Sequence, residues 1–153
     1  MCVMKDIMAS WDEKLRTAAR EGNIKEVELC VKNRANLECR DVAGMTPLIW
    51  AAVGGHLEVV TYLVTHDSQL EATDRIGLTP LMWAAVGGHL EVMTYLVTHG
   101  SQLETTSRSG RTALHYAAEN EQIDVIKCLI DQGCSPWVKT LEVHVTFSFI
   151  LIR

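Results

Sequence analysis

The chain has 153 residues, of which 48% are hydrophobic and 22% charged, and its formal net charge at pH 7 is -5. This hydrophobic content is enough to bury a core and too high for a disordered chain. The acidic balance, with Lys and Arg scattered along the chain, argues against a nucleic-acid partner, because such binding needs a basic stripe that displaces counterions.

The cysteines and the beginning of the chain bear on its compartment. The five cysteines are an odd number and no Cys-x-x-Cys pair occurs, so we expect free thiols in a reducing compartment. The first ten residues contain Lys5 and Asp6 and no apolar run, which does not fit a secretory signal. No apolar stretch approaches the roughly 20 residues of a membrane span. We therefore expect a cytoplasmic or nuclear protein with no membrane span.

The first forty residues predict a lead followed by two helices. Residues 1–10 are weakly patterned and are expected to fray. Ser10 and Glu13 have the spacing of a capping box, in which each side chain accepts a hydrogen bond from the backbone amide of the other residue. The first helix should begin there and end at Gly22, and a second should run over residues 24–32.

A nine-residue segment then recurs with a period of 33 residues. Its copies read GMTPLIWAA at 44–52, GLTPLMWAA at 77–85 and GRTALHYAA at 110–118. A fixed period of this length is the signature of a solenoid of stacked units. The predicted parts of the chain are a lead at 1–10, a degenerate first unit at 11–40, further units at 41–73, 74–106 and 107–139, and a tail at 140–153.

Each complete unit predicts a short helix, a returning helix and a polar finger. In the second unit Thr46 is the expected N-cap, and Pro47 takes the first helical position, where its missing amide costs nothing. Two alanines on the buried face let the neighbouring helix approach closely, and the pair of glycines at 54–55 ends the helix. An apolar stripe over 57–64 predicts the returning helix, and the polar residues 67–76 predict an extended finger.

The second and third units are near copies of each other. Residues 44–76 and 77–109 differ at seven positions, which indicates a recent duplication within the chain. The fourth unit carries weaker signals, since Ala113 replaces the proline at the start of its first helix and Glu121 replaces the glycine at its end.

After residue 139 the period fails. Residues 141, 143, 145, 147 and 149 are apolar and alternate with mostly polar ones, which is a strand period. Two interpretations of this tail stay open. In the first, it pairs as a strand or covers the open apolar end of the fourth unit. In the second, it is a non-native end, from read-through or an alternative exon, that replaces further repeats.

The repeated motif closely resembles the ankyrin repeat. The resemblance rests on Thr-Pro-Leu-x-x-Ala-Ala at 46–52 and 79–85, each followed by Gly-His-Leu, and on a looser copy at 112–118. It covers about residues 11–139 and implies an all-α solenoid of about four repeats, in which β-turn fingers join antiparallel helix pairs. It also implies a non-catalytic module without a cofactor that binds another protein as an adaptor, scaffold or inhibitor, and we expect a monomer. The alternative is a truncated fragment or isoform of a longer ankyrin-repeat protein whose activity lies in a missing domain.

The chain departs from the family pattern at several positions. Ile49 and Met82 replace the hydrogen-bonding histidine of the family, which only His115 retains, so apolar packing must replace that polar link in the middle repeats. Arg34 and Asp67 stand where the family has the glycine that closes the second helix. Glutamates replace the asparagine near the base of the finger, which puts its hydrogen bonds in doubt; they are Glu38, Glu71 and Glu104.

The resemblance implies a concave binding surface formed by the fingers and the exposed side of the first helices. Mapped onto this chain, the expected partner-binding residues are Val42, Met45, Val53, Arg75, Ile76, Leu78, Trp83, Val86, Arg108, Arg111 and Glu119. Its centre, around Val53 and Val86, is small and apolar, and its ends are charged or polar, as in protein interfaces. We expect it to bind a helix or an extended peptide with an apolar anchor. The alternative is that duplication copied these residues without selection for a partner.

Three aromatic residues, Trp50, Trp83 and Tyr116, share one position of the repeat. They should stack as a column between successive first helices. Aromatic side chains are frequent hot spots of interfaces, but we expect packing to be the main role here, with an exposed edge available to a ligand.

No catalytic or metal site is expected from the sequence. It contains no nucleophile elbow, phosphate-binding loop or His-Glu-x-x-His motif. Cys30 and Cys128 fall in the register of the second helices, where inert packing is expected. The histidines at turns and helix ends have no cysteine or aspartate joined to them in a zinc motif, so structural roles are expected; they are His56, His66, His89 and His99.

Overall fold

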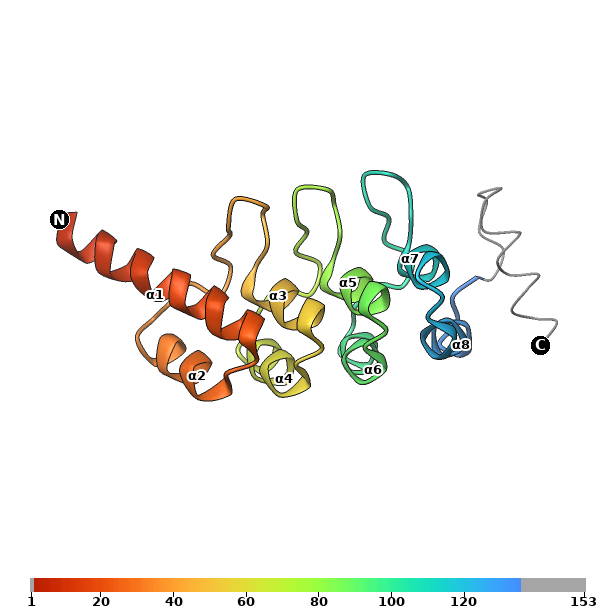
Figure 1. Cartoon of the computed structure of the whole chain (residues 1–153), viewed down its shortest axis with the longest axis horizontal. Helices are drawn as coiled ribbons and strands as arrows, with labels where there is room; N and C mark the ends of the chain where they lie inside the picture. Colours follow the sequence, from red (N-terminus) through yellow and green to blue (C-terminus); the bar gives the residue numbers. More distant parts are fainter. Residues whose placement is uncertain (1, 136–153) are drawn as a thin grey trace.

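The computed structural model describes residues 2–135, with side chains from residue 7 onward, and these residues form eight helices and no strand. The helices are α1 (Cys2–Glu21), α2 (Ile24–Lys32), α3 (Pro47–Gly54), α4 (Leu57–Thr65), α5 (Pro80–Gly87), α6 (Leu90–Thr98), α7 (Ala113–Glu119) and α8 (Ile123–Asp131). Figure 1 shows them as successive pairs, with α1, α3, α5 and α7 in one layer and α2, α4, α6 and α8 in a second. Loops project beyond the first layer between one pair and the next. The expected all-α solenoid is confirmed.

The helix boundaries in the two middle repeats follow the predicted caps. Thr46 and Thr79 have extended backbones, and their Oγ1 atoms accept hydrogen bonds from the amides three residues on, each at 3.3 Å. A proline occupies the first turn of α3 and of α5. Gly55, with a φ of 70°, and Gly88, with a φ of 72°, end these helices in the left-handed region, which suits a residue without a Cβ.

One core runs through the whole stack. The paired alanines of α3, α5 and α7 are fully buried, so each first helix packs closely against the next. Leu48, Leu81 and Leu114 take the same position in successive repeats and are also buried, and burial of such a side chain stabilises the fold by about 2 kcal/mol. No helix pair covers its apolar face alone, so each repeat depends on its neighbours.

The expectation for the N-terminus is wrong. Helix α1 begins at Cys2 and runs without interruption through Ser10, so residues 2–10 are helical and Ser10 caps nothing. The physical reason is that no proline or glycine precedes Gly22, so nothing in the sequence stops the helix from extending backwards. Trp11 packs against the core, whereas residues 7–10 are exposed, and Figure 1 shows this end of α1 projecting beyond the stack.

The second helices all end in a left-handed residue, whether or not glycine is present. Gly100 and Gly133 close α6 and α8 with φ values of 102° and 100°. Arg34 and Asp67 take the same place after α2 and α4, with φ values of 60° and 66°. The turn is therefore imposed by the stack even where the side chain makes that backbone unfavourable.

Three loops connect the repeats, and the name fingers is used below for their outer segments, residues 40–45, 73–78 and 106–111. The two interpretations of the tail concern residues 141–153, which lie outside the described residues.

Candidate functional site

Each of the first two fingers folds around one carboxylate. Oδ1 of Asp41 accepts hydrogen bonds from the amides of Ala43 and Met45, at 2.8 and 2.9 Å. Oδ1 of Asp74 accepts the equivalent pair in the second finger, both at 2.9 Å. Aspartate suits this position because its short side chain can bond backbone amides two and four residues ahead.

The second oxygen of each carboxylate ties the finger to the first helix. Oδ2 of Asp41 accepts a hydrogen bond from the indole Nε1 of Trp50 at 3.0 Å, and Asp74 accepts one from Trp83 at 2.9 Å. The two tryptophans are half-buried and also pack against the core. Packing against the core is therefore confirmed for these aromatic side chains, and the two indoles also tie each finger to its first helix.

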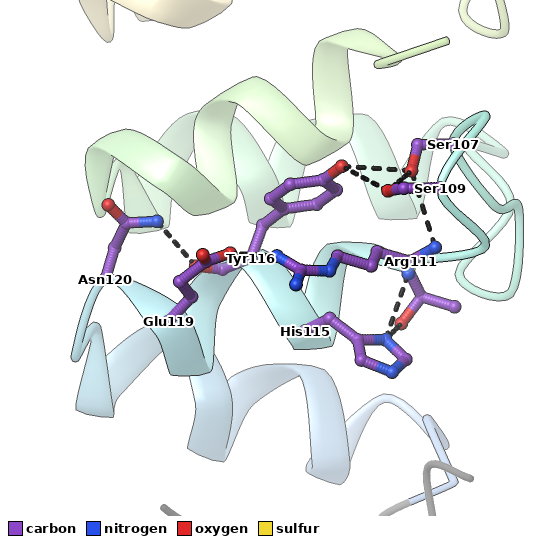
Figure 2. A network of polar contacts seen from close by, with 8 residues as sticks. Ser107, Ser109, Arg111, His115, Tyr116, Glu119 and Asn120 are labelled. Atoms are coloured by element: carbon purple, nitrogen blue, oxygen red, sulfur yellow. Dashed lines mark hydrogen bonds and ion pairs between the residues drawn. The ribbon is translucent and has the colours of Figure 1, made fainter. Parts of the chain in front are cut away.

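The fourth repeat makes the same link with different atoms. The hydroxyl of Tyr116 donates to Oγ of Ser107 at 2.9 Å, and Ser107 contacts the hydroxyl of Ser109 at 2.9 Å (Figure 2). Both ends of the link have changed together, from aspartate and tryptophan to serine and tyrosine. Sequence reasoning missed this link, although the spacing of nine residues between the partners recurs in all three copies.

Adjacent fingers are joined by their backbones. The amide of Arg75 donates to the carbonyl of Ala43 at 3.0 Å, and the amide of Arg108 donates to that of Ile76 at 3.2 Å. The contact is close enough to require glycine at the finger base, since a Cβ at Gly77 would lie 2.7 Å from the amide nitrogen of Arg108. The fingers thus form one connected row.

Two histidines join the second helices to the preceding repeat. Nε2 of His56 donates to the carbonyl of Arg20 at 3.0 Å, and Nε2 of His89 donates to that of Val53 at 2.9 Å. These contacts confirm structural roles for both histidines. Among residues 7–135, no group of three His, Cys, Asp or Glu side chains could hold a metal ion.

The glutamates that replace the family's asparagine also link repeats. Oε1 of Glu38 accepts a hydrogen bond from the amide of Gln69 at 2.9 Å, and Oε1 of Glu71 accepts one from Gln102 at 3.0 Å. Oε1 of Glu104 accepts a hydrogen bond from the amide of Ser135 at 3.3 Å. The longer side chain reaches into the following repeat, so its hydrogen bonds are made between repeats.

The retained histidine behaves differently from its two apolar replacements. Nδ1 of His115 accepts a hydrogen bond from the amide of Thr112 at 3.0 Å and also contacts the Thr112 hydroxyl. Burial, assisted by the nearby Arg111 charge, lowers the pKa of His115, so the neutral ring that accepts this bond is favoured. Ile49 and Met82 are fully buried, as expected for apolar packing.

Burial favours the protonated form of three cysteine side chains. Burial raises the pKa of Cys39 and of Cys134 to about 11, and it also raises the pKa of Cys30. A nucleophilic cysteine needs the opposite shift, toward the thiolate. These three cysteines and Cys128 are free in the structure.

Most of the predicted partner-binding residues lie on the fingers or on the exposed part of the first helices, and these two surfaces together are called the finger side below. Val42 is 85% exposed and Ile76 is 58% exposed at the finger tips. Others are exposed or half-buried; they are Arg75, Arg108, Glu119, Val53, Trp83, Val86 and Arg111. Arg111 and Glu119 form an ion pair of 2.6 Å beside Tyr116 (Figure 2).

A hollow of about 260 Å³ opens at the base of the first finger. It lies against α1, and Arg20 places its guanidinium carbon 5.6 Å from the ring centroid of Trp50. Its lining residues are Glu13, Arg16, Thr17, Arg20, Asp41 and Trp50. Sequence reasoning missed it, because it forms only where the degenerate first repeat meets the second.

Comparison with known families accounts for most of the chain. A family model described as ankyrin repeats (many copies) matches residues 15–64, and one described as ankyrin repeats (3 copies) matches residues 66–140. The chain belongs to the ankyrin-repeat family. Ankyrin-repeat proteins are typically non-catalytic modules that mediate protein–protein interactions. A comparison with curated proteins found no match.

In this ankyrin-repeat protein, two of the predicted surface positions are wrong. Met45 is 5% exposed and Leu78 is 3% exposed, so neither lies on the finger surface as expected. Each directly precedes the threonine cap, and its amide is held by the finger carboxylate. That bond fixes the backbone at the point where the finger returns to the helix, with these side chains buried.

The ankyrin stack contains no candidate for a membrane span. Within residues 2–135, none of the helices is both long enough and apolar enough to cross a bilayer.

Proposed function

We propose that this chain is a non-catalytic recognition module that binds a partner protein on its finger side, as an adaptor, scaffold or inhibitor in the cytoplasm or nucleus. The observation that carries the proposal is the exposure of Val42 and Ile76 at the finger tips, at 85% and 58%. Neither side chain belongs to the core of the repeats. Turns favour small polar residues, so apolar tips are unexplained by folding and fit a contact surface.

The surface behind the tips supports the same proposal. Val53 and Val86 are half-buried near the ends of α3 and α5, and each is followed by an exposed glycine. In this proposal a helix or an extended peptide places its apolar anchor on the two valines. Charged and polar residues flank the valines, such as Arg20 at one end and Glu119 at the other. An apolar centre with a polar rim is typical of protein interfaces.

The rigidity of the fingers also favours recognition. The carboxylate–indole bonds and the backbone bonds between fingers hold the surface in one arrangement before a partner arrives. A preorganised surface loses less conformational entropy on binding, so more of the contact energy appears as affinity.

The test is affinity purification with mass spectrometry, performed with the wild-type chain and with Val86→Glu. A buried carboxylate in the apolar centre should lower recovery of the partner by at least about tenfold. Ile123→Glu is the matched control, because Ile123 is an exposed apolar residue on α8, in the other layer. If Val86→Glu and Ile123→Glu both recover as much partner as the wild-type chain does, at unchanged thermal stability, the finger side is not the binding face.

A further inference from the structure

Positive charge on the middle of this chain is confined to the fingers. Between residues 42 and 126 the sequence has only three Lys or Arg side chains, Arg75, Arg108 and Arg111, and all three lie in the second and third fingers. Arg75 and Arg108 occupy the same position of successive fingers and are exposed. Within residues 7–135, Arg111 and Glu119 form the one ion pair, so Arg75 and Arg108 have no carboxylate partner there.

The carboxylates of the same span lie elsewhere. Apart from Asp74 and Glu119, all of them are in the second helices or in the turns beside those helices. Asp74 is buried, and its oxygens are occupied by two amides and an indole. The second and third fingers therefore present positive charge on a chain whose net charge is -5. Such a distribution steers an acidic surface to the fingers and away from the second helices.

The arginines alternate with apolar residues along the row of fingers. Ile76 is exposed directly beside Arg75, and Val42 takes the equivalent position to Arg75 in the first finger. At the first-repeat end, the hollow is lined by Arg16 and Arg20, together with the carboxylates of Glu13 and Asp41. The backbone bonds between fingers keep these groups in a fixed order.

We propose that the partner segment docked on the finger side is acidic, with Asp or Glu side chains flanking an aliphatic or aromatic anchor. Its carboxylates accept hydrogen bonds from the guanidinium groups of Arg75 and Arg108, for which the planar fork of arginine is well suited. Its anchor covers Ile76 and the valines behind the finger tips. This inference rests on the proposed function, because it names the chemistry of the partner for the same face.

The experiment is selection of a random-peptide display library against the full chain, followed by affinity measurement on the selected peptides by fluorescence anisotropy. Enriched peptides should be net negative, with acidic residues beside one apolar position. Their affinity should fall by about tenfold from low to high NaCl. Arg75→Glu and Arg108→Glu should each weaken binding by about fivefold.

Lys127→Glu makes the same charge change on α8, outside the fingers, and should leave affinity within about twofold. A charge swap gives the sharpest support. A peptide in which the contacting Glu is replaced by Arg should bind Arg108→Glu better than it binds the wild-type chain.

The outcomes separate this inference from the proposed function. Neutral or basic peptides that lose binding with Val86→Glu but not with the arginine variants would overturn the acidic partner and leave the face intact. Insensitivity to all three variants, or no enrichment, would overturn both. Tighter binding of a single-stranded oligonucleotide than of the peptides would replace the acidic protein segment by nucleic acid. Self-association in sedimentation that Arg108→Glu abolishes would replace it by a second copy of the chain.

Discussion

At the scale of single residues, each finger depends on a pair of side chains. Asp74 organises the turn with one oxygen and holds Trp83 with the other, and the equivalent pair acts in the first finger. Asp74 is buried, so an unpaired oxygen there would be costly. The fourth repeat shows that a serine and a tyrosine can make the same connection.

Trp83→Phe should lower the free energy of unfolding by about 2 kcal/mol, because it keeps a ring but removes the donor to a buried carboxylate. The double variant Asp74→Ser with Trp83→Tyr copies the fourth repeat and should be more stable, by about 1 kcal/mol, than the sum of its two single variants predicts. Urea denaturation followed by circular dichroism measures both effects. Strict additivity would mean that the two side chains do not interact.

At the scale of elements, the end of each second helix carries a local conflict between sequence and fold. Arg34 and Asp67 adopt the left-handed backbone that Gly100 and Gly133 adopt in the later repeats. The helix must turn there so that the chain can enter the next finger. The local penalty is offset by packing of the whole repeat.

Asp67→Gly should raise the free energy of unfolding by up to about 1 kcal/mol, since relief of the left-handed strain exceeds the extra backbone entropy of glycine. Gly100→Asp makes the reverse change at the equivalent site and should be destabilising. Thermal denaturation of both variants tests the pair. A loss of stability in Asp67→Gly would contradict the account of strain.

At the scale of the whole molecule, stability resides in the interfaces between repeats. Histidines, glutamates and the row of fingers each cross from one repeat to the next. Gly55 is left-handed and lies directly against the ring of His89, so a Cβ there would press on the following repeat. Coupling of this kind makes a short repeat array unfold as a unit.

Gly55→Ala should destabilise the chain by at least about 2 kcal/mol, from a left-handed alanine and displacement of His89 together. Glu121→Ala is the control, because Glu121 has the equivalent left-handed backbone, with a φ of 56°, but is already a residue with a Cβ. That control should change stability by less than about 0.5 kcal/mol. If the two variants lost similar amounts of unfolding free energy, contact with His89 across the repeat interface would not be the cause.

The sequence by itself determined the stack. The 33-residue period, the Thr-Pro caps and the paired alanines act locally or repeat in register, so the helix pairs, their order and most of the exposed finger residues could be predicted from them. Two departures of the middle repeats, Ile49 and Met82, were also interpreted correctly as buried.

Only the tertiary structure decided how the fingers are built and what they present. Met45 and Leu78 turn inward because a finger carboxylate holds their amides. The tryptophans pack against the core and also hold the fingers through hydrogen bonds to the same carboxylates. The arginines of the fingers and the carboxylates of the second helices are seen to be separated only when the fold places the fingers and the second helices on opposite sides of the first helices. Each of these features depends on which groups meet across a turn or between repeats, and a local pattern does not contain that information.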